Sequence, residues 1–214
     1  MIIPEHEAKI LLSDWGIDVV PTERVDSIMN LKANADYFGF PVVLKLSSSR
    51  HSHKTEIGGV VLGLDSYEEL EKAYVKLDNL KRDIDPSASI IIEPMIEPGV
   101  EFFLGIQRHE NFGLVLSFGL GGIFLELVRD ISFRLLPASW LDLAEMVEEL
   151  RSWPKLKEGF RNLPPVDMDE LLTFLDKIGD FATKQKGLEE MDLNPVSYVD
   201  GKFVVVDARI VKKE

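Results

Sequence analysis

The sequence contains no cysteine, which removes several kinds of chemistry. Without a thiol there is no disulfide framework, no thiolate nucleophile and no cysteine-based metal site. Long apolar runs are also missing, because no stretch approaches the roughly 18 residues that a membrane span requires. The first seven residues lack the basic and apolar regions of a signal peptide. Together these absences predict a cytoplasmic protein.

Basic side chains are scarce relative to acidic ones. The 214 residues include 24 Lys and Arg against 37 Asp and Glu, a net charge of -13 at pH 7. A surface of this charge repels a phosphate backbone, so we expect no nucleic acid partner and no membrane association. A nucleotide is still permitted, because a few placed cations, backbone N–H groups or a divalent metal can overcome a distant field locally.

The pattern of apolar residues predicts a mixed α+β protein. Helical periodicity and capping residues predict helices over 4–15, 27–38, 66–80, 139–150 and 167–184. β-Branched runs predict strands over 41–46, 59–64, 89–93, 100–107, 114–118 and 131–136. Asp200-Gly201, between extended segments, is a strong hairpin signal, whereas 153–165 is typical of a loop. Because the strands end in hairpins, we expect two α/β lobes rather than one doubly wound parallel sheet.

A polar loop over 47–59 joins two apolar strands and is rich in residues that suit phosphate. Gly58 and Gly59 allow the backbone to approach a ligand closely and to present N–H groups to an anion. Lys54 adds a compact positive charge. The alternative interpretation is a solvated surface loop.

Two ionisable side chains in this region are candidates for chemistry. Lys45 lies on an otherwise apolar strand, where an unpaired ammonium group costs several kcal/mol, so an anion should meet it. That anion could belong to a ligand or to an internal ion pair, or the side chain could reach solvent instead. The imidazole of His53 could accept a phosphoryl group or act as a general base, although a loop histidine is more often only solvated.

Acidic residues and a methionine lie at the junction of the expected lobes. Glu93, Met95 and Glu101 flank Pro94 and Pro98, and small-molecule sites often form at such junctions. The carboxylates could accept hydrogen bonds from ribose hydroxyls, and the methionine could pack on a purine. A rigid linker between the lobes is the alternative.

Asn194 and Asp207 lie near the ends of two strands that the expected hairpin joins. They could therefore face each other, and their oxygens are the hard ligands that Mg²⁺ takes in addition to phosphate and water. A turn signal at Asn194 and an ordinary strand end at Asp207 are the alternative.

The ordered segments closely resemble the ATP-grasp subunit of ADP-forming acetyl-CoA and related acyl-CoA synthetases, which are related to the succinyl-CoA synthetase β chain. The resemblance rests on residues 39–45, 52–60, 112–123, 130–134, 192–195 and 206–209. It implies an ATP-grasp fold over 1–214, with a nucleotide held between lobe one, about 20–94, and lobe two, about 1–19 plus 95–214.

The resemblance also implies roles for the candidate residues. In this family a phosphohistidine forms on the α-type chain, and the histidine that matches His53 is proposed to relay the phosphoryl group to ADP. The implied Mg²⁺ ligands are Asn194 and Asp207. The implied nucleotide-binding residues are Lys45, Lys54, Gly58, Gly59, Glu93, Met95 and Glu101.

The expected reaction is acyl-CoA + ADP + phosphate ⇌ carboxylic acid + CoA + ATP. Since the sequence contains no CoA-binding Rossmann segment, we expect a CoA-binding α-type partner, in an α2β2 assembly by analogy with the family. Two alternatives stay open at this point. A stand-alone ATP-grasp carboxylate–amine ligase would turn over without a partner, and a nucleotide-sensing regulatory subunit would bind nucleotide without supporting ATP formation.

Overall fold

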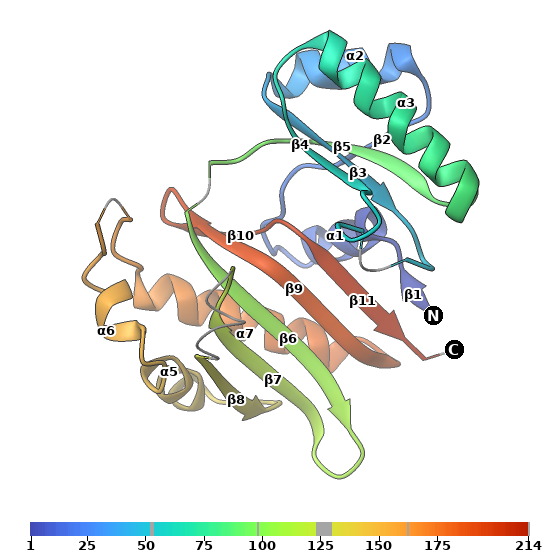
Figure 1. Cartoon of the computed structure of the whole chain (residues 1–214). Helices are drawn as coiled ribbons and strands as arrows, with labels where there is room; N and C mark the ends of the chain where they lie inside the picture. Colours follow the sequence, from blue (N-terminus) through green and yellow to red (C-terminus); the bar gives the residue numbers. More distant parts are fainter. Residues whose placement is uncertain (52–53, 98, 123–129, 162, 214) are drawn as a thin grey trace. The chain divides into compact units, whose positions relative to one another are not determined.

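The computed structural model describes residues 1–51, 54–97, 99–122, 130–161 and 163–213, which form two compact units (Figure 1). The smaller unit comprises Ile2–Lys9 and Val20–Ile96, and the larger comprises Met1, Ile10–Val19 and Glu97–Glu214. Helix α1 (Glu5–Asp14) contributes residues to both units. The expected lobe boundaries differ from this division mainly at the N-terminus, because residues 2–9 group with the smaller unit.

The smaller unit is built on an antiparallel sheet with two helices on one face (Figure 1). The strand order is β2 (Glu23–Val25), β5 (Ser89–Pro94), β3 (Val42–Ser47) and β4 (Val60–Leu64). The helices are α2 (Ile28–Phe38) and α3 (Tyr67–Ile84). Their apolar stripes pack with the strand residues in one hydrophobic core, because leucines and alanines recur on the inner face of each helix.

The two helices begin where the sequence predicts. The side chains of Ser27 and Ser66 accept the backbone N–H groups of Asn30 and Glu69, so each serine caps the first turn of its helix. All six residues of β3 are buried, which agrees with its continuous apolar run and makes Lys45 an ionisable group inside the unit.

The larger unit contains a second antiparallel sheet with helices along one face (Figure 1). Its strands follow the order β11 (Ala208–Lys212), β9 (Leu188–Val199), β6 (Val100–His109), β7 (Gly113–Leu120) and β8 (Ile131–Leu135), and β10 (Lys202–Val205) also pairs with β9. The helices are α5 (Trp140–Glu148), α6 (Trp153–Leu156) and α7 (Met168–Lys184). A short β1 (Ile2–Ile3) precedes α1.

Aromatic rings fill part of the core of the larger unit. Phe102 on β6 stacks on Phe118 of β7 with ring centroids 5.2 Å apart, and Phe174 of α7 stacks on Phe203 of β10 at 5.3 Å. The helix therefore shares the core with the hairpin that carries Phe203. None of the helices in the described ranges is both long enough and apolar enough to cross a membrane.

Some elements differ from those that the sequence predicts. The expected loop over 153–165 begins with α6, because Trp153 and Leu156 are three residues apart and both are buried, and Pro154 suits a first helical turn. The sequence pattern also missed β2, β11 and the first half of β9. These strands depend on pairing with distant segments, which local periodicity does not report.

Candidate functional site

Lys45 on β3 is buried and paired. The residue is 5% exposed, and its Nζ lies 2.9 Å from Glu5 Oε1 and 2.8 Å from Glu93 Oε2. The strand fixes this position, because Lys45 is in register with Val60 on one side and Ile91 on the other. Of the possibilities open at the sequence level, the internal ion pair is therefore realised.

A second ammonium group, that of Lys9, contacts the same two carboxylates. Lys9 Nζ lies 3.1 Å from Glu5 Oε1 and 2.5 Å from Glu93 Oε1. Thr22 donates its hydroxyl to the same oxygen of Glu93 at 2.8 Å. A buried ammonium group without a carboxylate partner would destabilise the fold strongly, so these contacts explain how Lys9 can be 1% exposed.

Within the described ranges, five residues of the smaller unit make up the ion cluster. They are Glu5, Lys9, Lys45, Lys54 and Glu93. Sequence reasoning identified the last three and missed Glu5 and Lys9. A signal was present, since Glu5, Ala8, Lys9 and Leu12 have the spacing of one helical face and the two apolar residues of that face are fully buried. Charged residues on the buried face of a helix indicate that residues of opposite charge lie beside them inside the protein.

Lys54 and the following glycines lie in the loop between β3 and β4. The Lys54 ammonium group donates to Glu5 Oε2. The Gly58 N–H donates to Thr55 O at 3.1 Å, and the Gly59 N–H donates to Lys54 O at 2.7 Å. A Cβ on Gly59 would lie 3.0 Å from Lys54 O, so close backbone approach requires glycine at this position. The loop thus uses both N–H groups in its own turns, and it holds Lys54 beside the cluster.

The remaining candidate for chemistry in this loop, His53, lies outside the described residues. A different histidine, His6 on α1, places Nδ1 3.0 Å from Ser47 Oγ. Burial lowers the pKa of His6, which favours the neutral imidazole at neutral pH. His6 therefore acts as a hydrogen-bonding link between α1 and the end of β3.

The residues expected near base and ribose are in different surroundings. Glu93 is 1% exposed, and its two oxygens form ion pairs with Lys9 and Lys45. Met95 is 41% exposed, and its N–H donates to Pro41 O at 3.0 Å. The Met95 side chain is therefore accessible to a ligand. Glu93 instead neutralises the charges of Lys9 and Lys45.

Glu101 on β6 borders a cavity of the larger unit. The Gly121 N–H donates to Glu101 O at 2.8 Å, and a Cβ on Gly122 would lie 3.1 Å from Glu101 Oε2. The cavity has a volume of about 670 Å³, and its lining is largely apolar apart from Glu101, Asp130, Arg151, Ser152 and Lys155. Glu101 is thus a carboxylate beside a space large enough for an organic ligand.

Asn194 and Asp207 lie on adjacent segments, as the hairpin predicts. The Asn194 N–H donates to Asp207 O at 3.3 Å. Asn194 is exposed and Asp207 is half-buried. Within the part of the chain that the structure describes, no group of three or more His, Asp or Glu side chains could hold a metal. The donor set is one amide oxygen and one carboxylate, which fits a cation that completes its shell with phosphate and water.

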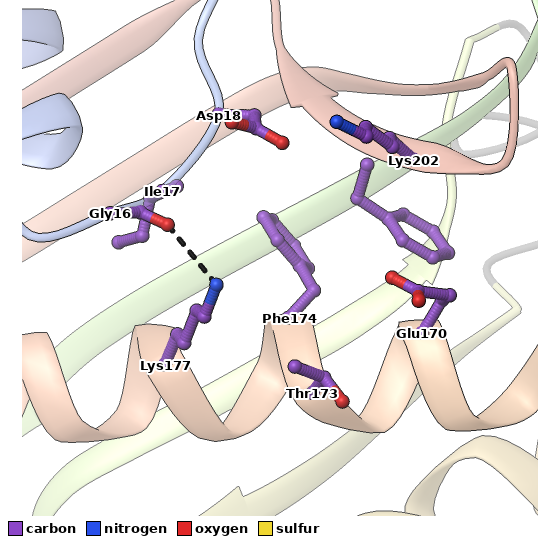
Figure 2. Close-up of a pocket in the computed structure, with 9 residues that line it drawn as sticks. Gly16, Ile17, Asp18, Glu170, Thr173, Phe174, Lys177 and Lys202 are labelled. Carbon is purple, nitrogen blue, oxygen red and sulfur yellow. Dashed lines mark hydrogen bonds between the residues drawn. The ribbon is translucent and has the colours of Figure 1, made fainter.

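A second cavity of the larger unit, about 240 Å³, contains none of the candidate residues (Figure 2). It lies between the segment that follows α1, one face of α7 and the start of β10, and Lys177 reaches across it to donate to Gly16 O at 3.2 Å. Its lining residues are Gly16, Ile17, Asp18, Glu170, Thr173, Phe174, Lys177, Lys202 and Phe203. Because Asp18 and Glu170 offset Lys177 and Lys202, this cavity has no excess charge that would select a phosphate.

Known proteins resemble the chain in sequence. The ATP-grasp domain family matches residues 1–211. The β subunit of ADP-forming acetate–CoA ligase II from Pyrococcus furiosus is 36% identical over 215 residues, which cover 98% of this chain and 91% of the relative. ADP-forming acetate–CoA ligase II from Archaeoglobus fulgidus is also 36% identical, over 100% of this chain, but the chain spans only 31% of that protein.

Solved structures of acetyl-coenzyme A synthetase 1 from Ca. Korarchaeum cryptofilum resemble the chain in fold. The complex with coenzyme A and Ca-AMPCP has a TM-score of 0.90 at 38% identity and covers 99% of this chain and 93% of the solved chain. The complex with coenzyme A and Mg-AMPPCP, whose phosphohistidine segment points towards the nucleotide-binding site, has a TM-score of 0.83 at 37% identity, with the same coverage. The chain belongs to the ATP-grasp family, and within it to the β-subunit and ATP-grasp portions of ADP-forming acetate–CoA ligases.

Proposed function

We propose that the chain is the nucleotide-binding β-type subunit of an ADP-forming acyl-CoA synthetase, which converts acyl-CoA, ADP and phosphate to a carboxylic acid, CoA and ATP. The observation that carries this proposal is the match to the Pyrococcus furiosus β subunit over 98% of this chain and 91% of that subunit. In the Archaeoglobus relative the matching region is only 31% of the protein.

The buried lysines suit phosphoryl transfer. The transition state of this reaction is loose and spreads charge over the phosphoryl oxygens, so catalysis depends on alignment and charge neutralisation. Lys45 and Lys54 would contact the phosphates, and the loop that carries Gly58 and Gly59 would cover them. Met95 and Glu101 would lie near the base and ribose. Glu93, which the sequence predicts there too, would act mainly by holding Lys45 in place.

The oxygen donors of Asn194 and Asp207 would hold Mg²⁺. When bound, the ion would neutralise phosphate charge and help to align the transferring group. A Mg-AMPPCP complex of the Korarchaeum synthetase supports this choice of metal. Asp207 would be the more important ligand, since a carboxylate carries the charge that the amide of Asn194 lacks.

A CoA-binding α-type subunit, in an α2β2 complex in the cytoplasm, would complete the enzyme. The phosphoryl group would arrive as a phosphohistidine of that partner, and His53 would relay it to ADP. The phosphohistidine segment of the Korarchaeum synthetase supports the first of these steps. Radiolabel from phosphate should therefore appear on protein as an acid-labile, base-stable adduct before ATP forms.

Thermal unfolding with nucleotide is the first test. A ligand at about 100 times its dissociation constant stabilises a protein by about 2.7 kcal/mol, which raises the Tm of a domain of this size by about 5 to 11 °C. We expect a rise of that order with ADP and Mg²⁺, and its loss in Asp207→Ala. Asp200→Asn, in the exposed hairpin turn, is the control and should keep the full rise.

Activity with the partner is the second test. The reconstituted complex should form ATP from acyl-CoA, ADP and phosphate, and Asp207→Ala should abolish this activity. Turnover by the chain alone would instead identify a stand-alone ligase. Nucleotide binding without ATP formation in the reconstituted complex would contradict the enzymatic proposal.

A further inference from the structure

The Glu5 carboxylate contacts both lysines to which the proposed function assigns the nucleotide phosphates. Its Oε1 lies 2.9 Å from Lys45 Nζ, and its Oε2 accepts a hydrogen bond from Lys54 Nζ. One carboxylate thus uses its two oxygens in the way that two oxygens of a phosphate would be used. Because Glu5 is 5% exposed, it contacts these ammonium groups without the screening that water provides.

Glu5 and Glu93 play unequal parts in the ion cluster. Glu93 contacts Lys9 at 2.5 Å and Lys45 at 2.8 Å, so both of these lysines keep a carboxylate if Glu5 is removed. Lys54 also pairs with Glu5, through the other oxygen of that carboxylate. Glu93 therefore neutralises the lysines that lie deepest, whereas Glu5 is the carboxylate that a competing anion could replace.

The ammonium groups around Glu5 keep its carboxyl ionised. Among the described residues, the Glu5 carboxylate lies within ion-pair distance of three ammonium groups, those of Lys9, Lys45 and Lys54. Burial alone would raise the pKa of the Glu5 carboxyl, but the three surrounding ammonium groups together hold that pKa well below its usual range. Glu5 is consequently ionised at neutral pH and cancels positive charge that would otherwise attract phosphate.

We propose that Glu5 is an internal counter-ion that competes with nucleotide phosphates for Lys45 and Lys54. This inference rests on the proposed function, because it concerns the same phosphate-binding lysines. Glu5 stabilises the fold by neutralising buried charge, and it weakens phosphate binding for the same reason. Phosphate binding then becomes an exchange of one oxyanion for another, which keeps an anion beside both lysines and favours release of the nucleotide product.

The test compares stability with affinity in Glu5→Gln. This substitution keeps the shape of the side chain and removes its charge. We expect a lower urea midpoint, an affinity for Mg-ADP about tenfold higher than that of the wild type, and an unchanged affinity for adenosine, measured by calorimetry on the full chain. A purely structural role predicts the opposite result for Mg-ADP, since a disturbed site binds less tightly. Glu68→Gln, which breaks the exposed pair between Glu68 and Lys72, should change none of the three.

A second variant, Glu5→Asp, tests the proposal even if Glu5→Gln folds poorly. Glu5→Asp retains the charge, but its shorter side chain cannot reach both lysines, so Mg-ADP affinity should rise about threefold. In the Lys54→Gln background the gain from Glu5→Gln should shrink, because Glu5 acts through Lys54. Failure of the wild type to bind Mg-ADP would contradict the proposed function itself. If the wild type binds Mg-ADP and the Glu5 variants bind it equally or less well, the proposed function stands. The proposal that Glu5 competes with the phosphates is then overturned.

Discussion

The exposed carboxylate of Glu149 is fixed by hydrogen bonds from two side chains of β8. Arg134 on β8 donates from Nη1 to Glu149 Oε2 at 3.0 Å and from Nη2 to Oε1 at 2.8 Å, and Ser132 donates its hydroxyl to Oε2 as well. These hydrogen bonds, from Arg134 first and Ser132 second, lower the pKa of Glu149 to about 2. The two-pronged contact ties β8 to the end of α5, and it gives this carboxylate a pH dependence that can be measured.

We predict that this pair contributes to stability above pH 4.5 and loses its contribution as the pH falls towards 2. The sign follows because the pKa in the folded state is about 2 while the ordinary value is 4.5, so the unfolded chain takes up the proton first. The Glu149 side chain is 55% exposed, so solvent screening limits the contribution to about 0.5 kcal/mol.

Urea unfolding of wild type and Glu149→Gln between pH 2 and 7 checks this prediction. The difference in unfolding free energy between the two proteins should be present at pH 7 and should vanish near pH 2. Glu148→Gln on the same exposed turn is the control. A difference that stays constant from pH 7 to pH 2 would show that the variant acts through packing instead of charge.

At the scale of the element, the hairpin between β9 and β10 depends on one glycine. Asp200 and Gly201 both have positive φ values, 51° and 77°, which is the backbone that a two-residue turn of this type requires. A Cβ on Gly201 would meet no atom within 4 Å, so a substitution there adds backbone strain without a clash. The turn matters for the site because β9 carries Asn194 and the chain beyond β10 carries Asp207.

We therefore predict that Gly201→Ala lowers the free energy of unfolding by about 1 kcal/mol, the cost of a left-handed conformation for a residue with a Cβ. Chemical denaturation measures the change, and Lys202→Ala at the next exposed position should stay within about 0.5 kcal/mol of the wild type. The Asn194–Asp207 pair should also become less well ordered, so the Mg²⁺-dependent stabilisation by ADP should fall. An unchanged midpoint would mean that the turn adopts another geometry.

The elements that the sequence predicted well are marked by residues within or directly beside them. Ser139 forms a capping box with Asp142 at the start of α5, and Asp167 accepts the N–H groups of Asp169 and Glu170 at the start of α7. The first half of β9 has no such signal, because Glu189, Glu190 and Asp192 interrupt its apolar alternation. Its pairing with β6 and β11 decides its structure. Local chemistry is readable in a sequence, whereas pairing between distant segments is not.

The partners of the site residues also depend on distant segments of the chain. The sequence showed that Lys45 needs an anion, but it did not show that residues 40 and 48 positions away in the chain, Glu5 and Glu93, would supply it. The identity of the partner depends on how α1 and β5 fold around β3. The sequence predicted that Gly58 and Gly59 present their N–H groups to an anion, and this stays a prediction. In the structure both N–H groups donate to carbonyl oxygens within the turns of the loop.

At the scale of the whole molecule, the chain carries a net charge of -13 at pH 7, and its isoelectric point is about 4.8. Like charges spread over one chain repel each other, and this repulsion destabilises the folded state more than the expanded one. Salt screens the repulsion, since the Debye length falls from about 30 Å at 10 mM to about 8 Å at 150 mM. Buried pairs such as Lys9 with Glu93 are screened far less.

We predict that raising NaCl from about 10 to 150 mM at pH 8 increases the Tm of the chain by about 2 to 4 °C, which corresponds to about 1 kcal/mol for a domain of this size. The rise should be the same in choline chloride, because screening does not depend on the cation. It should be absent near pH 4.8, where the net charge is close to zero. A fall in Tm with salt at pH 8 would mean that attractive surface pairs, such as Lys184 with Asp180, outweigh the net repulsion. Calorimetric scans at the two salt concentrations, in both salts and at both pH values, separate these outcomes.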